Sequence, residues 1–115
     1  MDRKIVVEKY VSDADGLVAV LYSPGYGAGW STWNSGELGT EFMMFDQQLV
    51  KFALEGADEA TVEEYLDKIT EHVPYLGGWR DIEIAWMEPG TTFIISEYDG
   101  GEGIQLCDEI NWWKA

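Results

Sequence analysis

The sequence predicts one α+β domain over residues 1–115, with a mainly antiparallel sheet and two helices on one of its faces. Segments rich in β-branched and aromatic residues gather near the two ends of the chain, at 5–22 and 82–107. Two segments with helical periodicity lie between them, at 46–55 and 58–73. Strands and helices that are segregated in this way along a chain are typical of the α+β class.

An N-terminal hairpin is predicted around Asp15–Gly16. Its first strand is the short run 5–7. Its second strand is the continuous apolar run 17–22, which ends at Ser23-Pro24-Gly25. An apolar run without alternation indicates a strand that is buried on both faces.

The helical middle has clear start and stop signals. Asp46 and Asp58 are good N-caps, Gly56 suits a left-handed helix end, and Pro74 bars continuation of the second helix. The buried stripes of the two helices are expected at Leu49, Phe52, Ala53, Val62, Tyr65, Leu66, Ile69 and Val73.

A three-stranded meander is predicted for the C-terminal third. Residues 82–87, 91–98 and 104–107 form its strands, with turns at Pro89-Gly90 and Asp99-Gly100-Gly101 and an extension at Trp112–Trp113. The expected core joins Leu17, Val18, Val20, Leu49, Phe52, Val62, Leu66, Ile69, Ile82, Ile84, Trp86, Phe93 and Ile95.

A glycine-rich stretch over residues 23–40 has no helix or strand period, and ordered loops of this length are often functional. Its G-x-G-x-G spacing opens no helix and lacks a P-loop lysine, which argues against a dinucleotide or P-loop site. The loop either packs back on the sheet, binds a protein, or forms a small-molecule pocket with aromatic stacking faces. The ligand-binding candidates for this last alternative are Tyr26, Gly27, Gly29, Trp30 and Trp33.

A formal net charge of -15 is the most unusual property of the composition. It repels nucleic acid phosphates and anionic membranes, so neither is an expected partner. It attracts proteins with basic surfaces, although acidic residues also serve solubility alone. The protein-binding candidates are Glu59, Glu63, Glu64, Asp67 and Glu71.

Catalysis, cofactors and metal binding find little support. His72 and Cys107 are each the only residue of their type, and zinc sites need several such ligands. Asp13, Asp15, Asp99 and Glu102 do not form a calcium-binding EF-hand loop, and Cys107 is expected to be a structural strand residue. We therefore expect no enzyme, and the single cysteine together with a non-apolar start predicts a cytoplasmic protein.

The chain resembles a family of short acidic proteins of unknown function encoded by tailed bacteriophages. The resemblance rests on residues 20–33, on 82–86 and on 93–100, and with the helical middle it covers nearly the whole chain. It implies a site of action in the cytosol of a bacterial host.

The predicted function is a non-enzymatic binding protein that inhibits or sequesters a host protein, such as a defence or nucleic-acid-handling factor, through its acidic surface. One alternative is a small-molecule or nucleotide-sequestering protein that uses the glycine-rich loop. A further alternative is an accessory phage structural protein, and a homo-oligomer is compatible with each.

Overall fold

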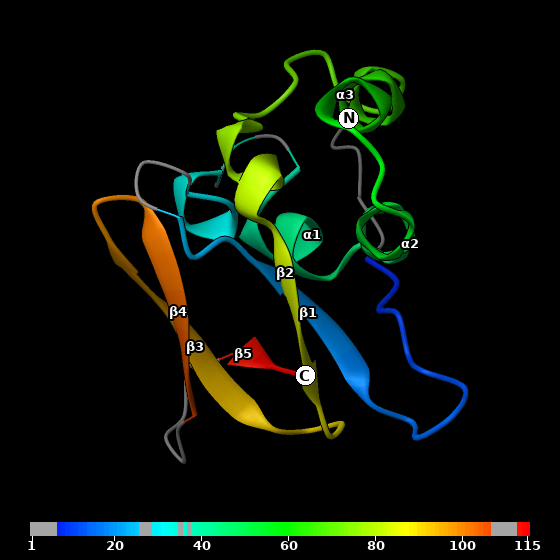
Figure 1. The fold of residues 1–115 in the computed structure, drawn as a ribbon, viewed down its shortest axis with the longest axis vertical. Coiled ribbons are helices and arrows are strands. Elements are labelled where there is room, and N and C mark those ends of the chain that lie inside the picture. The colour runs from blue at the N-terminus through cyan, green and yellow to red at the C-terminus, as the bar shows by residue number, and fades with distance from the viewer. Residues whose placement is uncertain (1–6, 26–28, 35, 37, 107–112) are drawn as a thin grey trace, which may run out of the picture.

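The computed structural model describes residues 7–25, 29–34, 36, 38–106 and 113–115, and it confirms the α+β class (Figure 1). The elements, in chain order, are β1 (Val18–Tyr22), the 3₁₀ helix η1 (Ser31–Trp33), α1 (Thr40–Phe45), α2 (Gln47–Glu55), α3 (Glu59–Asp67), the 3₁₀ helix η2 (Gly77–Asp81), β2 (Glu83–Met87), β3 (Thr92–Tyr98), β4 (Gly101–Leu106) and β5 (Trp113–Lys114).

The described strands form two antiparallel sheets, with orders β1-β2 and β4-β3-β5. All three predicted C-terminal strands are present, but their pairing differs from a meander, because β2 pairs with β1 and not with β3. The edge of β3 next to the Pro89–Gly90 turn is taken by β5, and the Gly90 N–H donates to the Ala115 carbonyl at 2.8 Å. The last residues of the chain therefore take the edge of β3 that β2 would occupy in a meander.

Two tight turns match their sequence signals. Asp99 and Gly100 have φ values of 54° and 86°, which is the left-handed pair that a two-residue hairpin loop requires. The N-terminal hairpin around Asp15–Gly16 is also present, with the Ser12 N–H donating to the Leu17 carbonyl at 2.9 Å. Residues 10–12 lie opposite the start of β1. Ile5 and Val6 lie outside the described residues.

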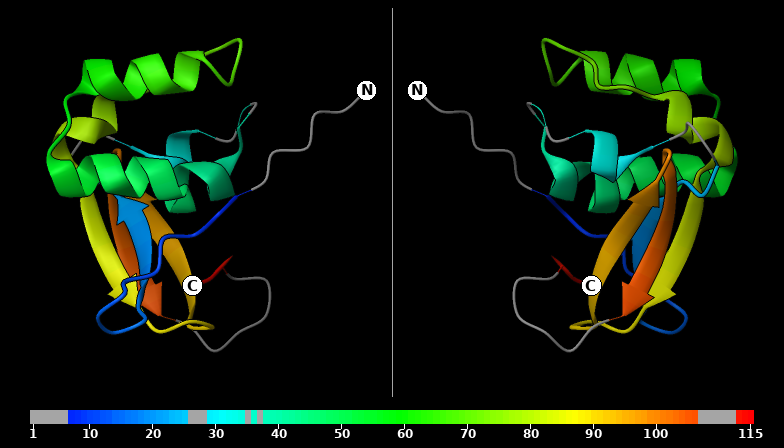
Figure 2. Two further views of the ribbon diagram at one scale, coloured as in Figure 1. Left: turned by 90° about the vertical axis from the view of Figure 1, so that its right-hand side faces the viewer. Right: turned by 90° about the vertical axis from the view of Figure 1, so that its left-hand side faces the viewer.

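Strand β1 is buried on both faces, as its continuous apolar run predicts. Ala19 and Leu21 face a core shared with the helices, whereas Val18 and Val20 face a second core between the sheets, together with Phe93 of β3. Figure 2 shows the helices gathered over one end of the strands. Helices α1 and α2 contact the β1–β2 sheet, and α3 forms the layer beyond α2.

The caps of α2 and α3 follow the prediction. The Asp46 carboxylate accepts from the Leu49 N–H at 3.1 Å, and the Asp58 carboxylate accepts from the Thr61 N–H at 2.9 Å. Gly56 ends α2 in the left-handed region with a φ of 70°. Burial raises the pKa of Asp46 against the opposing hydrogen bond from the Tyr65 hydroxyl, and the same burial, together with Asp46, raises the pKa of Tyr65.

Helix α3 is shorter than predicted, because it ends at Asp67 while the apolar stripe continues to Val73. The N–H groups of Ile69 and Thr70 both donate to the Leu66 carbonyl, and the Thr70 hydroxyl accepts from the His72 N–H at 3.4 Å. A Thr hydroxyl that bonds to nearby backbone competes with helix continuation. Val73 packs against the core from an irregular segment that follows the helix.

Helix α1 was not predicted from the sequence. Phe42, Met43, Met44 and Phe45 are all buried, since α1 lies against β1 on one side and η1 on another. Four consecutive buried apolar residues in a helix of six show no 3.6-residue pattern in the sequence.

Most of the predicted core is confirmed. Among the described residues, Leu17 and Trp86 are the exceptions, because neither joins a core. Trp86 is 40% exposed and packs edge-on against Tyr10. Strand β2 runs away from the helices (Figure 1), so they cover Ile82 and Ile84 near its start but not Trp86 near its end. Val18, Val20, Leu49, Val62, Leu66 and Phe93 are buried, while Leu17, Phe52, Ile69, Ile82, Ile84 and Ile95 are half-buried.

Candidate interaction surface

The glycine-rich loop is tied to strand β4 by one buried carboxylate, that of Glu102, which is only 3% exposed. One carboxylate oxygen accepts from the Ser23 N–H at 3.0 Å, and the other accepts from the N–H groups of Trp30 at 2.8 Å and Thr32 at 2.9 Å. The Thr32 hydroxyl donates to the second oxygen as well. We call these four residues the Glu102 clamp.

The clamp explains how the Glu102 carboxylate can be buried although none of these contacts comes from a cation. A buried carboxylate is costly unless hydrogen bonds satisfy it, and here three N–H groups and a hydroxyl do so. The Glu102 N–H also donates to the Ser23 carbonyl at 2.8 Å. The predicted turn at 99–101 gave no indication of this role, although Glu102 shares its strand face with the half-buried Ile104.

Trp30 is a core residue and not an open ligand-binding side chain, which corrects its place among the ligand-binding candidates. Its side chain is fully buried, its indole N–H donates to the Met43 carbonyl, and its ring lies 5.7 Å from that of Trp79. No face of Trp30 is left for a stacked base. Tyr26 and Gly27 lie outside the described residues, as does Cys107.

Trp33 has the opposite placement, since it is 44% exposed and lies against Tyr75, which is 46% exposed. The two ring centroids are 5.3 Å apart and the rings are tilted by 41°. We call Trp33 and Tyr75 the aromatic platform. Tyr75 was missed by the sequence analysis, because 41 residues separate it from the side chain of Asn34 that holds it in place.

Asn34 joins the two halves of the platform through three hydrogen bonds. Its amide nitrogen donates to the carbonyls of Trp30 at 2.9 Å and Tyr75 at 2.8 Å, and its amide oxygen accepts from the Tyr75 N–H at 2.9 Å. Asn34 is 7% exposed, so these bonds are shielded from water. The arrangement fixes the backbone beneath both rings.

The acidic residues of α3 are on its outer side. Glu63, Glu64 and Asp67 are exposed, whereas Val62 and Leu66 anchor the opposite side of the helix in the core. Glu64 lies 3.7 Å from Lys68, a pair that is about three-quarters exposed. Glu59 is half-buried in the first turn, and Glu71 is exposed beyond the helix end.

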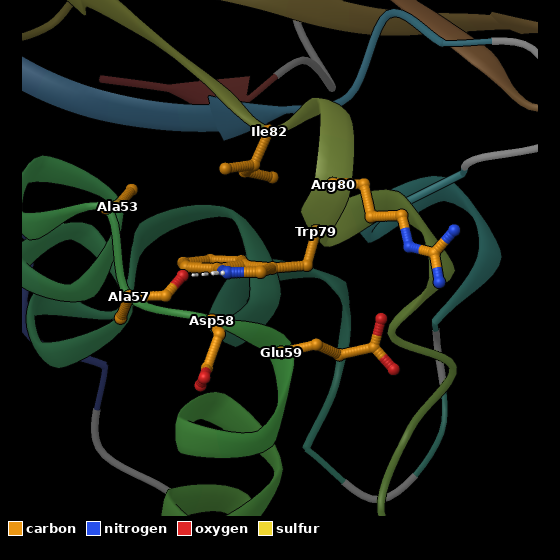
Figure 3. A pocket seen from close by; sticks show the side chains of 8 residues that line it. Ala53, Ala57, Asp58, Glu59, Trp79, Arg80 and Ile82 are labelled. Atoms are coloured by element: carbon orange, nitrogen blue, oxygen red, sulfur yellow. Dashed lines mark hydrogen bonds between the residues drawn. The ribbon is translucent and has the colours of Figure 1, made fainter.

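A groove of about 620 Å³ opens at the start of α3 (Figure 3). Its apolar floor consists of Ala53, Ala57, Trp79 and Ile82. The charged groups Asp58, Glu59 and Arg80 stand at its rim. The Trp79 indole N–H donates to the Ala57 carbonyl at 2.7 Å, which fixes the ring in the floor. Sequence reasoning missed this groove because three separate elements form it.

Among the described residues, no three His, Cys, Asp or Glu side chains are grouped so as to hold a metal ion. Asp13, Asp15 and Asp99 form no such group with Glu102, whose oxygens are used by the clamp. His72 is exposed just beyond α3. Within the residues that the structure describes, no helix is long and apolar enough to cross a membrane.

Comparison with known proteins identifies no relative: no family model, curated protein or solved structure matches this chain.

Proposed function

We propose that this protein is a non-enzymatic binding protein that inhibits or sequesters a basic host protein in the bacterial cytosol. The observation that carries the proposal is the charge of the segment from Glu55 to Glu71. This segment holds seven acidic residues against Lys68 alone, and its three central acids are exposed on one helix.

Helix α3 is a firm support for these charges. Val62 and Leu66 are fully buried and Asp58 caps the first turn, so the outer face is held in register by the core. Side chains three or four positions apart on a helix lie about 5–6 Å from each other. Glu63 and Asp67 therefore present a closely spaced row of carboxylates to a row of cations.

The net charge of the whole protein also favours binding to a basic partner. A net charge of -15 on 115 residues attracts a basic surface from a distance and repels competing polyanions. Such charge complementarity acts chiefly on the association rate, and salt screens it over about 8 Å at physiological ionic strength. Binding is expected to weaken as salt rises.

The test compares two triple variants of equal charge. One carries Glu63→Lys, Glu64→Lys and Asp67→Lys on α3, and the other reverses the exposed acids Asp13, Glu41 and Glu88 elsewhere. Both raise the formal net charge from -15 to -9, because each reversal adds two charges. A partner captured from host lysate should associate with the α3 variant about tenfold more slowly or worse, and with the control variant much less so.

Circular dichroism and thermal melts of both variants show whether the fold is kept. A partner whose binding ignores both salt and the α3 reversals would rule out the acidic surface as the binding site.

A second candidate function, small-molecule binding, is favoured by the groove at the start of α3. Its volume of about 620 Å³ lies within the range of roughly 300–1,000 Å³ that is common for ligand sites. An apolar floor beside Arg80 and two carboxylates suits a ligand with both charges (Figure 3). A small-molecule screen by thermal shift, repeated with Arg80→Ala, tests this candidate: stabilisation that the variant loses supports it.

A further inference from the structure

We infer that the aromatic platform of Trp33 and Tyr75 binds an arginine side chain of a basic partner, an inference that rests on the proposed function. The platform is an exposed pair of large rings on a protein that carries strong negative charge. Single exposed aromatic residues need no explanation, but two in contact and rigidly supported do. Aromatic residues of this kind are enriched in protein interfaces.

The rings are held in position before any partner arrives. A Cβ built on Gly29 would lie 2.3 Å from atoms of the Trp33 ring, and one on Gly77 would lie 2.1 Å from the Tyr75 hydroxyl. Each ring therefore rests on a glycine. With the Asn34 bridge and the Glu102 clamp beneath them, the rings lose little freedom on binding, which favours affinity.

Charge decides which flat ligand suits the platform. A base in a nucleotide or nucleic acid comes with phosphates that the net charge of -15 repels. A guanidinium group brings a positive charge, and its planar face stacks on aromatic rings as well as binding them by cation–π attraction. Lysine has the charge without the planar face. Arginine is therefore the side chain that fits both the rings and the field around them.

The experiment uses three ten-residue peptides, made of arginine, of lysine, or of citrulline, which is the uncharged analogue of arginine. Their affinities for the intact protein are measured by calorimetry at low salt. We expect the arginine peptide to bind most tightly, the lysine peptide more weakly, and the citrulline peptide least.

The first variants are Trp33→Leu and Tyr75→Leu, which keep an apolar side chain and remove the ring. Each should weaken binding of the arginine peptide about two- to fivefold, the range for a cation–π contact at an exposed site. The effect on the lysine peptide should be smaller. Tyr98→Leu is the matched control, since Tyr98 is 77% exposed at the β3–β4 turn, and it should bind as the unmodified protein does.

Gly29→Ala is a second route to the same result. It keeps both rings and every charge, but its methyl group displaces the Trp33 ring. Binding of the arginine peptide should fall as it does in Trp33→Leu. Melting curves confirm folding of each variant, and Tyr75→Leu carries the test if a change at Gly29 or Trp33 impairs folding.

The outcomes separate this inference from the proposed function. If the α3 reversals weaken binding of the arginine peptide while both ring variants bind like the Tyr98 control, the inference fails and the proposed function stands. If only the ring variants lose affinity, the platform is a site but the acidic helix is not the docking surface. Equal affinity for the arginine and citrulline peptides would also overturn the inference.

Discussion

Helices α2 and α3 and the glycine-rich loop are all held by carboxylates that accept backbone N–H groups, but over very different sequence distances. Asp46 and Asp58 bond to N–H groups three residues ahead. Glu102 bonds to N–H groups 70 to 79 residues away. Local sequence therefore sets the ends of the helices, whereas the shape of the loop depends on a strand that lies 70 or more residues further along the chain.

This difference predicts which region of the molecule a given substitution disturbs. The acidic face of α3 should survive changes in the loop, because its supports are its own caps and its contacts with the core. The aromatic platform should be sensitive to β4, because the clamp holds Trp30 and Thr32, the residues next to η1 and within it.

The largest expected effect comes from Glu102→Ala. It leaves three N–H groups and the Thr32 hydroxyl without their acceptor, and each buried unsatisfied donor costs roughly 1–3 kcal/mol. The free energy of unfolding should fall by about 4 kcal/mol, measured by urea denaturation.

Amide hydrogen exchange tests the local part of that prediction. In Glu102→Ala, the amides of Trp30 and Thr32 should lose protection while those of Val62 and Leu66 keep theirs relative to global unfolding. Glu102→Gln should be intermediate, because an amide can accept on one side only. Uniform loss of protection in both regions would show that the loop and the helices are not separable.

Leu66→Ala tests the other region. The Leu66 side chain is fully buried on the inner face of α3, so its truncation should cost about 3 kcal/mol, within the usual range of about 2–5. Urea melts measure the loss. At temperatures where the variant is folded, affinity for the basic partner should be unchanged, since Glu63, Glu64 and Asp67 lie off the buried stripe. A variant as stable as the unmodified protein would show that this helix face is assigned wrongly.

The smallest expected effects concern pH and the two caps. Burial raises the pKa of Asp46 above its ordinary value of 3.8, so its contribution to stability is complete below that pH and is lost as pH rises through the raised pKa. Hydrogen bonds from Thr61 lower the pKa of Asp58, so its contribution is present above pH 3.8 and is lost as pH falls through the lowered pKa.

The variants Asp46→Asn and Asp58→Asn test these two directions, because their stabilities relative to the unmodified protein should change with pH in opposite senses. Asparagine keeps a capping oxygen, so neither variant should unfold the protein. As pH falls from 7 towards 3, the unmodified protein should gain stability relative to Asp46→Asn and lose it relative to Asp58→Asn. Thermal melts across this range measure both differences, and profiles of equal sign would contradict the burial of Asp46.

The sequence predicts the ends of the helices correctly where neighbouring residues alone decide the backbone conformation. The N-caps Asp46 and Asp58 and the end at Gly56 depend on groups within one turn. The left-handed turn at Asp99–Gly100 and the doubly buried run of β1 likewise belong to single segments. Of the candidate surface, the sequence indicated the acids of α3 and the ring of Trp33, because charged and aromatic residues can be located along the chain without knowing the fold.

By itself, the sequence determined the α+β class, the caps and the tight turns, since each element depends on side chains within a few positions of one another. It also determined the negative charge, which is a sum over the chain. Tertiary structure alone decided that Trp30 is buried while Trp33 is exposed, that Tyr75 lies beside Trp33, and that Glu102 holds the loop. It also decided that β2 joins β1 while β5 takes the edge of β3. The physical reason is shared: a buried donor, ring or strand edge must find a partner, and the chain meets the partners that satisfy these groups only once it has folded.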